Sequence, residues 1–369
     1  MSRGPGLAGA LGIELADMLL RAWQRRNAEA ERRARFADPA VRVGVEVIRS
    51  AHGAISEAEV AHRLKAVREA QPEWWFAAGV DPLERVGDVD QVVATGRSIV
   101  AIEVKSTWRG PEQLDQAARA ARALGRLSGS HRVLPFLVVV GGDQPAQRHF
   151  AADGTAVTMV GPSFLASAVQ SFVRGEGAFV PSAAPRLARQ LHTAEQERLQ
   201  ISAAMAHCAR WLARSEWLVA SHVSLMGVSG PVRLLAAGPT GLFVAEPAGI
   251  DEHAAAVRAA RKARQLATTM GGLRCEAIPV VLRGKGTPAE WLTMASGETV
   301  WGIDATEAAG WLHHTPPRAG VQPGQVARMR GPAPGWSYEL KSGDDGGWSW
   351  WVQANHETVP PSWPRGQAA

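Results

Sequence analysis

The chain has 369 residues, of which 46% are hydrophobic and 20% are charged, and its formal net charge is +5 at pH 7. This length is enough for two or three globular domains, and the small positive charge is compatible with a nucleic-acid partner without requiring one. The two cysteines, Cys208 and Cys275, are too few and too far apart for a disulfide framework, which favours a reduced, cytoplasmic compartment.

The N-terminal segment, residues 1–40, is predicted to contain a basic helix over residues 13–36. Its arginines would either contact nucleic acid or face solvent, and the second interpretation is favoured. Glu14 and Asp17 interrupt the most apolar part of this segment, and the sequence has no run of 18 uncharged apolar residues. We therefore expect neither a signal peptide nor a membrane span. The abundance of Ala, Arg, Gly and Trp is typical of a high-GC bacterial genome.

Residues 41–72 are predicted to be helical. Ser56 and Glu59 have the spacing of a capping box, in which two side chains satisfy the free backbone N–H groups at a helix start. This pattern predicts that a helix carrying Glu57 begins at Ser56. A glutamate in a first helical turn also complements the helix dipole, so Glu57 has a structural interpretation beside a functional one. Trp74 is expected to anchor the strand that follows.

A predicted β-hairpin, residues 87–106, organises the first half of the chain. Residues 89–94 are largely β-branched, a turn follows, and residues 99–104 form an apolar run of the kind found in buried central strands. Four charged residues are set into this hairpin: Asp88, Asp90, Glu103 and Lys105. Charges in a core hairpin are costly unless they are paired or bind a metal ion, so their presence requires an explanation.

Strand geometry predicts how these charges meet. Side chains two residues apart project on the same face, so Glu103 and Lys105 lie together, and pairing of the two strands brings Asp90 next to Glu103. Two carboxylates and the backbone carbonyl of Val104 form a hard oxygen site suited to Mg²⁺ or Mn²⁺. Lys105 would orient or deprotonate a water for attack on a phosphodiester. Asp88 is the rival of Asp90 as a ligand.

The pattern Asp90-x12-Glu103-x-Lys105 resembles the PD-(D/E)xK nuclease superfamily. The stretches GDVDQVV and IEVKS, within residues 87–106, look more closely like the nuclease-related (NERD) domain, and the resemblance covers residues 45–175. It favours Asp90 over Asp88 as the ligand, and it implies Glu57 and Gln116, on the helices before and after the hairpin, as further site residues. It also implies DNA rather than RNA as the substrate. The implied fold for residues 41–180 is α/β, with a restriction-endonuclease-like mixed central sheet flanked by helices.

The remaining elements of this domain are also predicted from local patterns. A helix over residues 112–127 carries Arg119, Arg122 and Arg126 on one side, where they would contact a phosphate backbone or simply face solvent. The expected later elements are strands at residues 132–140 and 156–160, a helix at 162–174 and a linker, PSAAP, at 181–185.

The second half of the chain, residues 186–315, repeats the first. Residues 230–249 align without a gap on residues 87–106, at a constant offset of 143, and a helix and a strand follow in the same order. Glu103 keeps a counterpart in Glu246, whereas the other site positions change: Asp88 to Pro231, Asp90 to Arg233, Lys105 to Ala248 and Gln116 to Ala255. We therefore expect a degenerate copy that has lost its metal site and in which Arg233 pairs with Glu246.

Residues 316–369 are predicted to form a Pro/Gly-rich linker and a tryptophan-rich tail. Residues 336–352 have the pattern of a β-hairpin around an Asp-Asp-Gly-Gly turn. A lone hairpin is too small to be stable, so its aromatic face must pack on another surface. We expect it to dock on the second domain, with a base-stacking or partner-binding surface as the alternative.

Taken together, these patterns favour a Mg²⁺- or Mn²⁺-dependent nuclease acting on DNA. Two other classes stay open. One is a nucleic-acid-binding scaffold with an idle site, and the other is an interaction module that recruits a protein partner through the tryptophan-rich tail. RNA as a substrate and assembly into a homodimer are also compatible with the sequence.

Overall fold

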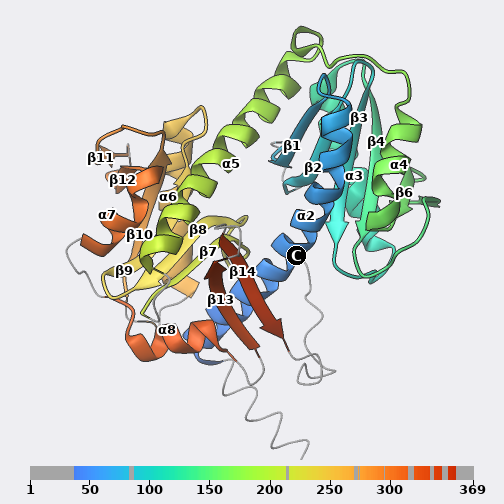
Figure 1. Cartoon of the computed structure of the whole chain (residues 1–369). Coiled ribbons are helices and arrows are strands. Elements are labelled where there is room, and N and C mark those ends of the chain that lie inside the picture. The colour runs from blue at the N-terminus through green and yellow to red at the C-terminus, as the bar shows by residue number, and fades with distance from the viewer. Residues whose placement is uncertain are drawn as a thin grey trace, which may run out of the picture.

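The computed structural model describes residues 37–82, 87–212, 216–269, 273, 275–294, 296–314, 320–332, 336–342 and 348–354. The basic helix predicted over residues 13–36 and the predicted Asp-Asp-Gly-Gly turn lie outside these residues. The described chain forms two six-stranded mixed sheets flanked by helices, together with a two-stranded hairpin (Figure 1). No helix in this part of the chain has the length and hydrophobicity needed to cross a membrane.

The first sheet has the strand order β1-β2-β3-β4-β6-β5. Its strands are β1 (Trp75–Val80), β2 (Val89–Ala94), β3 (Ser98–Lys105), β4 (Arg132–Val139), β5 (Gln147–Phe150) and β6 (Ala156–Val160). The first three form an antiparallel meander, and helix α3 (Glu112–Ser128) then crosses over so that β4 runs parallel to β3. Helix α4 (Pro162–Phe172) follows β6. The edge strand β5 is absent from the sequence prediction, because its four residues are mostly exposed and show no alternation of apolar and polar side chains.

The second sheet repeats this plan in the order β7-β8-β9-β10-β12-β11. Its strands are β7 (Leu218–Val223), β8 (Val232–Gly238), β9 (Gly241–Pro247), β10 (Ala277–Arg283), β11 (Glu290–Thr293) and β12 (Thr299–Asp304). Helix α6 (Glu252–Thr269) takes the place of α3, and α7 (Ala308–His314) follows the last strand. The predicted duplication of an α/β unit is confirmed.

A backbone irregularity is shared by both copies. Gly79 in β1 and His222 in β7, 143 residues apart, both have left-handed φ values, of 63° and 54°. The pairing of each strand with its neighbour skips this residue, opposite Asp90 in the first copy and Arg233 in the second. Glycine adopts this conformation at little cost, whereas histidine does so less readily. The second copy has therefore kept the backbone shape of the site although its residues have changed.

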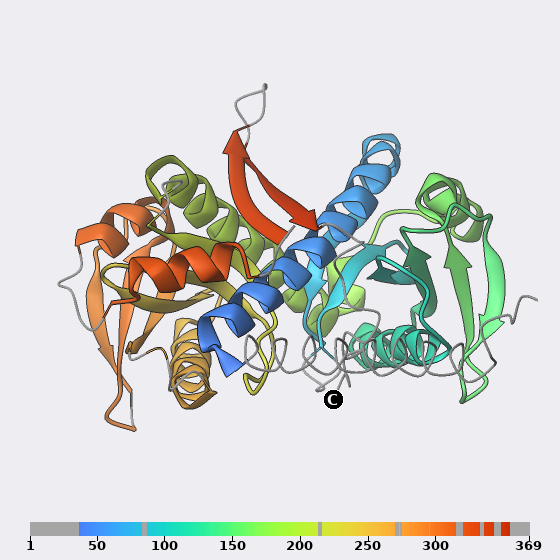
Figure 2. The same ribbon diagram turned by 90° about the horizontal axis from the view of Figure 1, so that it is seen from below.

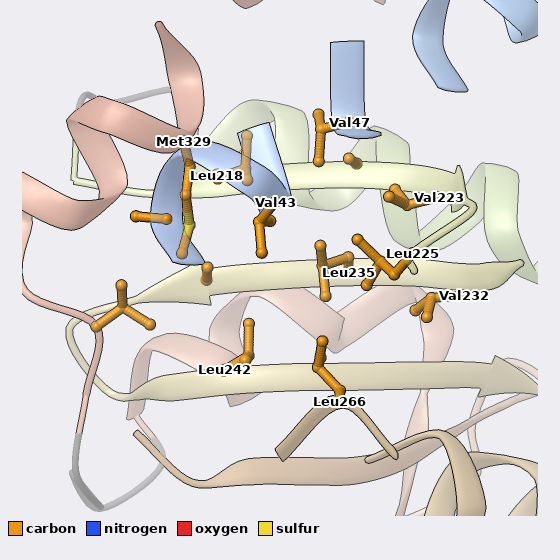
Figure 3. Close-up of a cluster of buried hydrophobic side chains, with 14 of the residues drawn as sticks. Val43, Val47, Leu218, Val223, Leu225, Val232, Leu235, Leu242, Leu266 and Met329 are labelled. Atoms are coloured by element: carbon orange, nitrogen blue, oxygen red, sulfur yellow. The ribbon is translucent and has the colours of Figure 1, made fainter. Parts of the chain in front are cut away.

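Two long helices connect the sheets reciprocally. Helix α2 (Pro39–Ala70) packs its N-terminal half against the second sheet, through Val43, Val47 and neighbouring apolar residues (Figure 3), and its C-terminal half against the first. Helix α5 (Pro185–Leu212) does the reverse: its N-terminal half covers the first sheet and its C-terminal half the second. Both helices run between the two sheets in Figure 1. Each copy therefore completes its core with a helix half that the other copy supplies.

The predicted helix start at Ser56 is wrong. Helix α2 begins seventeen residues earlier, where the Asp38 side chain accepts a hydrogen bond from Ala40 N at 2.8 Å and Pro39 occupies the first helical position. Ser56 is buried within the helix, and its hydroxyl donates to His52 O at 3.1 Å instead of capping a free N–H. The helix continues through Ser56 because its apolar first half has the second sheet to pack against, a contact that the local sequence does not reveal.

The segment after the second sheet packs back onto α2. Helix α8 (Pro323–Arg330) buries Val326 and Met329 in the core that α2 shares with the second sheet. Gly44 of α2 is required here, because a Cβ at this position would overlap the carbonyl of Met329. The predicted hairpin is present as β13 (Trp336–Ser342) and β14 (Trp348–Ala354), which pair antiparallel and lie against α2 and α8 (Figure 2).

Candidate active site in the first copy

The five predicted site residues come together at one end of the first sheet. Asp90 is the second residue of β2, and Glu103 and Lys105 are near the end of β3. The pairing of Gln91 with Ile102 aligns the two strands so that Asp90 and Glu103 reach the same end, as predicted. Helix α3 brings Gln116 to this end, and α2 brings Glu57.

Hydrogen bonds connect four of these side chains and the strand backbone. The Asp90 carboxylate accepts from Val104 N at 2.6 Å. Glu103 is 2% exposed, and its Oε2 atom accepts from Lys105 Nζ at 3.3 Å and from Gln116 Nε2 at 2.9 Å. These bonds fix the two carboxylates and place the lysine directly beside one of them.

The site carries more negative charge than its one lysine offsets. Burial, followed by repulsion from Asp90, raises the pKa of Glu57 to about 8. The same two causes raise the pKa of Glu103 to about 8, and burial raises the pKa of Asp90 to about 6 despite the opposing effects of Lys105 and the Val104 N–H group. These three buried carboxylates lose stability when they ionise close together. A bound divalent cation would offset this cost.

The donor set fits Mg²⁺ or Mn²⁺ better than a metal that needs a complete protein cage. Among the described residues, no group of three or more His, Cys, Asp and Glu side chains is arranged to hold a metal ion. Mg²⁺ is commonly bound through one or two carboxylates, with waters and substrate phosphate oxygens completing its shell. Asp90 and Glu103 form such a pair. Val104, the predicted carbonyl ligand, is connected to the pair through its N–H group.

Asp88 is engaged elsewhere. Its Oδ2 atom lies 2.7 Å from Nη1 of Arg233, which belongs to the second copy. The carboxylate that bonds to the β3 backbone at Val104 is that of Asp90. The geometry thus favours Asp90 over its rival Asp88 as the metal ligand, in agreement with the sequence resemblance.

The predicted side-chain pair between Arg233 and Glu246 is wrong. Glu246 is buried and pairs with Lys262 at 2.8 Å and with Arg258 at 3.6 Å, and it contacts Arg233 only through the backbone N–H of that residue, at 3.2 Å. Lys262 has no charged counterpart in the first copy, where Ala123 occupies the aligned position. The sequence offered one indication of the pairing between Glu246 and Lys262, because Lys262 is a charged residue among the small, buried residues of α6. The second copy thus surrounds Glu246, the counterpart of Glu103, with cationic side chains.

A further glutamine shapes the loop after Lys105. Gln113 is buried, accepts from Arg109 N at 3.0 Å and donates to Thr107 O at 3.2 Å, which fixes the loop between β3 and α3. Trp108 in this loop is 44% exposed. The sequence predicts Gln116 but not Gln113 as a site residue, because a side chain that holds a loop has no spacing pattern of its own.

The arginine row on α3 faces solvent. Arg119, Arg122 and Arg126 are exposed, and Arg122 contacts Asp153 and Thr155 at the neighbouring edge of the domain. The two sequence interpretations of this row, a phosphate contact and a solvated face, are both consistent with this placement.

Replacing Glu57 with Gln is expected to stabilise the ion-free protein at high pH. Because the folded-state pKa is raised from 4.5 to about 8, the folded protein binds the extra proton between these values and loses stability as the pH rises through that window. Glu57→Gln removes this loss, so its free energy of unfolding should be close to that of the wild type at pH 5 and exceed it at pH 8.5 by up to about 4 kcal/mol, with a higher melting temperature.

The matched control for this substitution is Glu59→Gln on the same helix. Glu59 forms an exposed ion pair with Arg63 at 2.8 Å, and its removal should cost no more than about 0.5 kcal/mol, with the opposite sign. Thermal unfolding of both variants in EDTA at the two pH values tests this. A Glu57→Gln protein that is less stable than the wild type at pH 8.5 would contradict the assignment of Glu57 to the acid cluster.

No protein-family model, curated protein sequence or solved structure matches the chain.

Proposed function

We propose that the chain is a metal-dependent nuclease that hydrolyses phosphodiester bonds, with DNA as the preferred substrate. The observation that carries this proposal is the convergence of Asp90, Glu103 and Lys105 at one end of the first sheet. The order of elements supports it: a helix with Glu57, the strand pair with the acids and the lysine, a helix with Gln116 and then a core strand. This is the order in which the resemblance to the PD-(D/E)xK superfamily places its motifs, and it favours a restriction-endonuclease-like fold for each copy.

The residues of the chain would divide the chemistry as follows. Asp90 and Glu103 would bind the Mg²⁺ or Mn²⁺ ion, with the Val104 carbonyl as the backbone ligand implied by the resemblance. When bound, the ion would supply Lewis-acid stabilisation of the phosphate charge and lower the pKa of a water. Lys105, 22% exposed, would orient the attacking water and contact the phosphate. Gln116 would hold Glu103 in place through the hydrogen bond to Oε2.

A second candidate function is nucleic-acid binding without cleavage. The specific observation in its favour is the second copy, which keeps the whole sheet while Arg233, Ala248 and Ala255 replace Asp90, Lys105 and Gln116 of the site. A sheet that is kept although its site residues have changed indicates that the fold has a role other than catalysis. The exposed Trp108, three residues after Lys105, would give such a protein a surface for base stacking.

Incubation of the purified chain with nucleic acid tests the proposed function. Supercoiled plasmid, linear duplex DNA, single-stranded DNA and RNA would each be supplied with Mg²⁺, Mn²⁺ or EDTA. We expect cleavage of DNA with Mg²⁺ or Mn²⁺, none with EDTA, and products that carry 5′-phosphates. A folded protein that shifts DNA in a gel but cuts none of these substrates would support the binding function instead. Cleavage that persists in EDTA would contradict the metal-dependent mechanism.

A further inference from the structure

Arg233 reaches out of the second copy and into the first. It is the second residue of β8, the position that Asp90 occupies in β2. Its guanidinium Nη1 lies 2.7 Å from Asp88 Oδ2, and its Nη2 lies 4.0 Å from Glu197 Oε2 on α5. The two side chains of the closer pair are 11% and 20% exposed, so this ion pair is largely withdrawn from water.

The surroundings of Arg233 direct it toward Asp88. The acid of its own copy, Glu246, is already paired with Lys262 and Arg258. On the side of the first copy, the guanidinium lies beside Gly79, where a Cβ would make an ordinary van der Waals contact with Nη1 at 3.9 Å. The reciprocal ion pair cannot form, because the counterpart of Asp88 in the second copy is Pro231, which has no charge.

Asp88 is a further acid close in sequence to the candidate active site. It lies two residues before Asp90, and its charge acts on Glu57, Asp90 and Glu103. A fourth free carboxylate beside the two ligands would compete for the ion and draw it away from Lys105. An arginine pairs with a carboxylate firmly and keeps its own charge at any physiological pH, so it is suited to remove Asp88 from this competition.

We propose that Arg233 is a positioning residue for the active site of the first copy: by pairing with Asp88 across the interface between the copies, it keeps this carboxylate out of the metal centre. The degenerate copy is then a structural component of the active site of the other. This proposal rests on the metal site of the proposed function and names the role of the second copy in it.

The test is Mn²⁺ binding by electron paramagnetic resonance, with plasmid cleavage in parallel, on the full chain. Arg233→Gln should bind Mn²⁺ roughly three- to tenfold more tightly, because Asp88 joins the ligands, and should cleave at least about tenfold more slowly, because the ion is displaced from Lys105. The double variant Asp88→Asn/Arg233→Gln should return both values to within about threefold of the wild type. Asp88→Asn alone should leave Mn²⁺ affinity unchanged.

Arg258→Gln is the matched control. It removes an arginine that contacts Glu197 and Glu246 within the same cluster, and both measurements should stay at wild-type values. The proposal is overturned if Arg233→Gln behaves as Arg258→Gln does, if the double variant is as slow as Arg233→Gln, or if Asp88→Asn weakens Mn²⁺ binding tenfold. Wild-type protein that binds Mn²⁺ but cuts nothing contradicts the nuclease function alone, and the series of affinities still decides the role of Arg233. Wild-type protein that binds no Mn²⁺ overturns both.

Discussion

Replacing Asp90 with Asn is expected to reduce metal-dependent cleavage by at least about a thousandfold, equivalent to about 4 kcal/mol of transition-state stabilisation. The amide has nearly the same shape and still accepts the hydrogen bond from Val104 N, so the pairing of β2 with β3 is kept. What it lacks is the negative charge needed to hold a divalent cation next to Glu103. Lys105→Met should produce a comparable loss, since it removes the group proposed to orient the attacking water.

The stability of the Asp90→Asn variant distinguishes loss of the metal ligand from misfolding as the cause of lost cleavage. The pKa of Asp90 is raised from 3.8 to about 6, so its ionisation costs folding free energy as the pH rises through this window, and the cost is complete at pH 8. In EDTA at pH 8, Asp90→Asn should therefore be at least as stable as the wild type while being inactive. Asp88→Asn, the neighbouring substitution, should retain cleavage within a few-fold. Equal losses from the two substitutions, or cleavage that survives Asp90→Asn, would show that the ligand has been assigned wrongly.

The convergence of Asp90, Glu103 and Lys105 was predictable because its signals are local. A period of two along β2 and β3 places Asp90, Glu103 and Lys105 on one face whatever surrounds the sheet, and the register of a short hairpin follows from its turn. The alignment of the second half of the chain on the first predicted the second sheet for a similar reason, because a duplicated sequence folds with the same strand order.

The partners of Arg233 and the length of α2 could not be predicted in this way. Asp88 and Arg233 are 145 residues apart in sequence, and they meet only because the two copies pack with their helices exchanged. The same exchange gives the apolar stretch before Ser56 a surface to bury, and so extends α2 through a position that resembles a helix start. Both errors have one cause: the sequence pattern specifies each copy separately, whereas the contacts between copies decide these details.

Replacing Leu187 with Asp is expected to unfold the first copy, although Leu187 belongs to the helix that opens the second. Its side chain is fully buried among residues of β1, β2, β3 and α3. An aspartate there would place an unpaired carboxylate in an apolar core and leave a cavity, at a cost of more than about 4 kcal/mol. We expect a large fall in the melting temperature, aggregation and loss of cleavage.

Leu199→Asp provides the control on the same helix. Leu199 is 46% exposed, so this substitution should change the free energy of unfolding by no more than about 0.5 kcal/mol. Thermal unfolding and light scattering of the two variants make the comparison. If Leu187→Asp melted at the same temperature as Leu199→Asp, helix α5 could not be packed on the first sheet, and the exchange of helices between the copies would be refuted.

The exchange of helices also affects the order in which the protein can fold as it is synthesised. Ile48 on α2 is translated about 170 residues before Leu218, a member of the apolar cluster that buries it. At elongation rates of about 5–20 residues per second, the first half of α2 waits roughly 10–30 s for its partner strands to leave the ribosome. During that time its valines and isoleucine are available to chaperones, and a nascent chain that stops early keeps them exposed. The first half of α2 is thus made early in translation but buried late, after the strands of the second sheet have been synthesised.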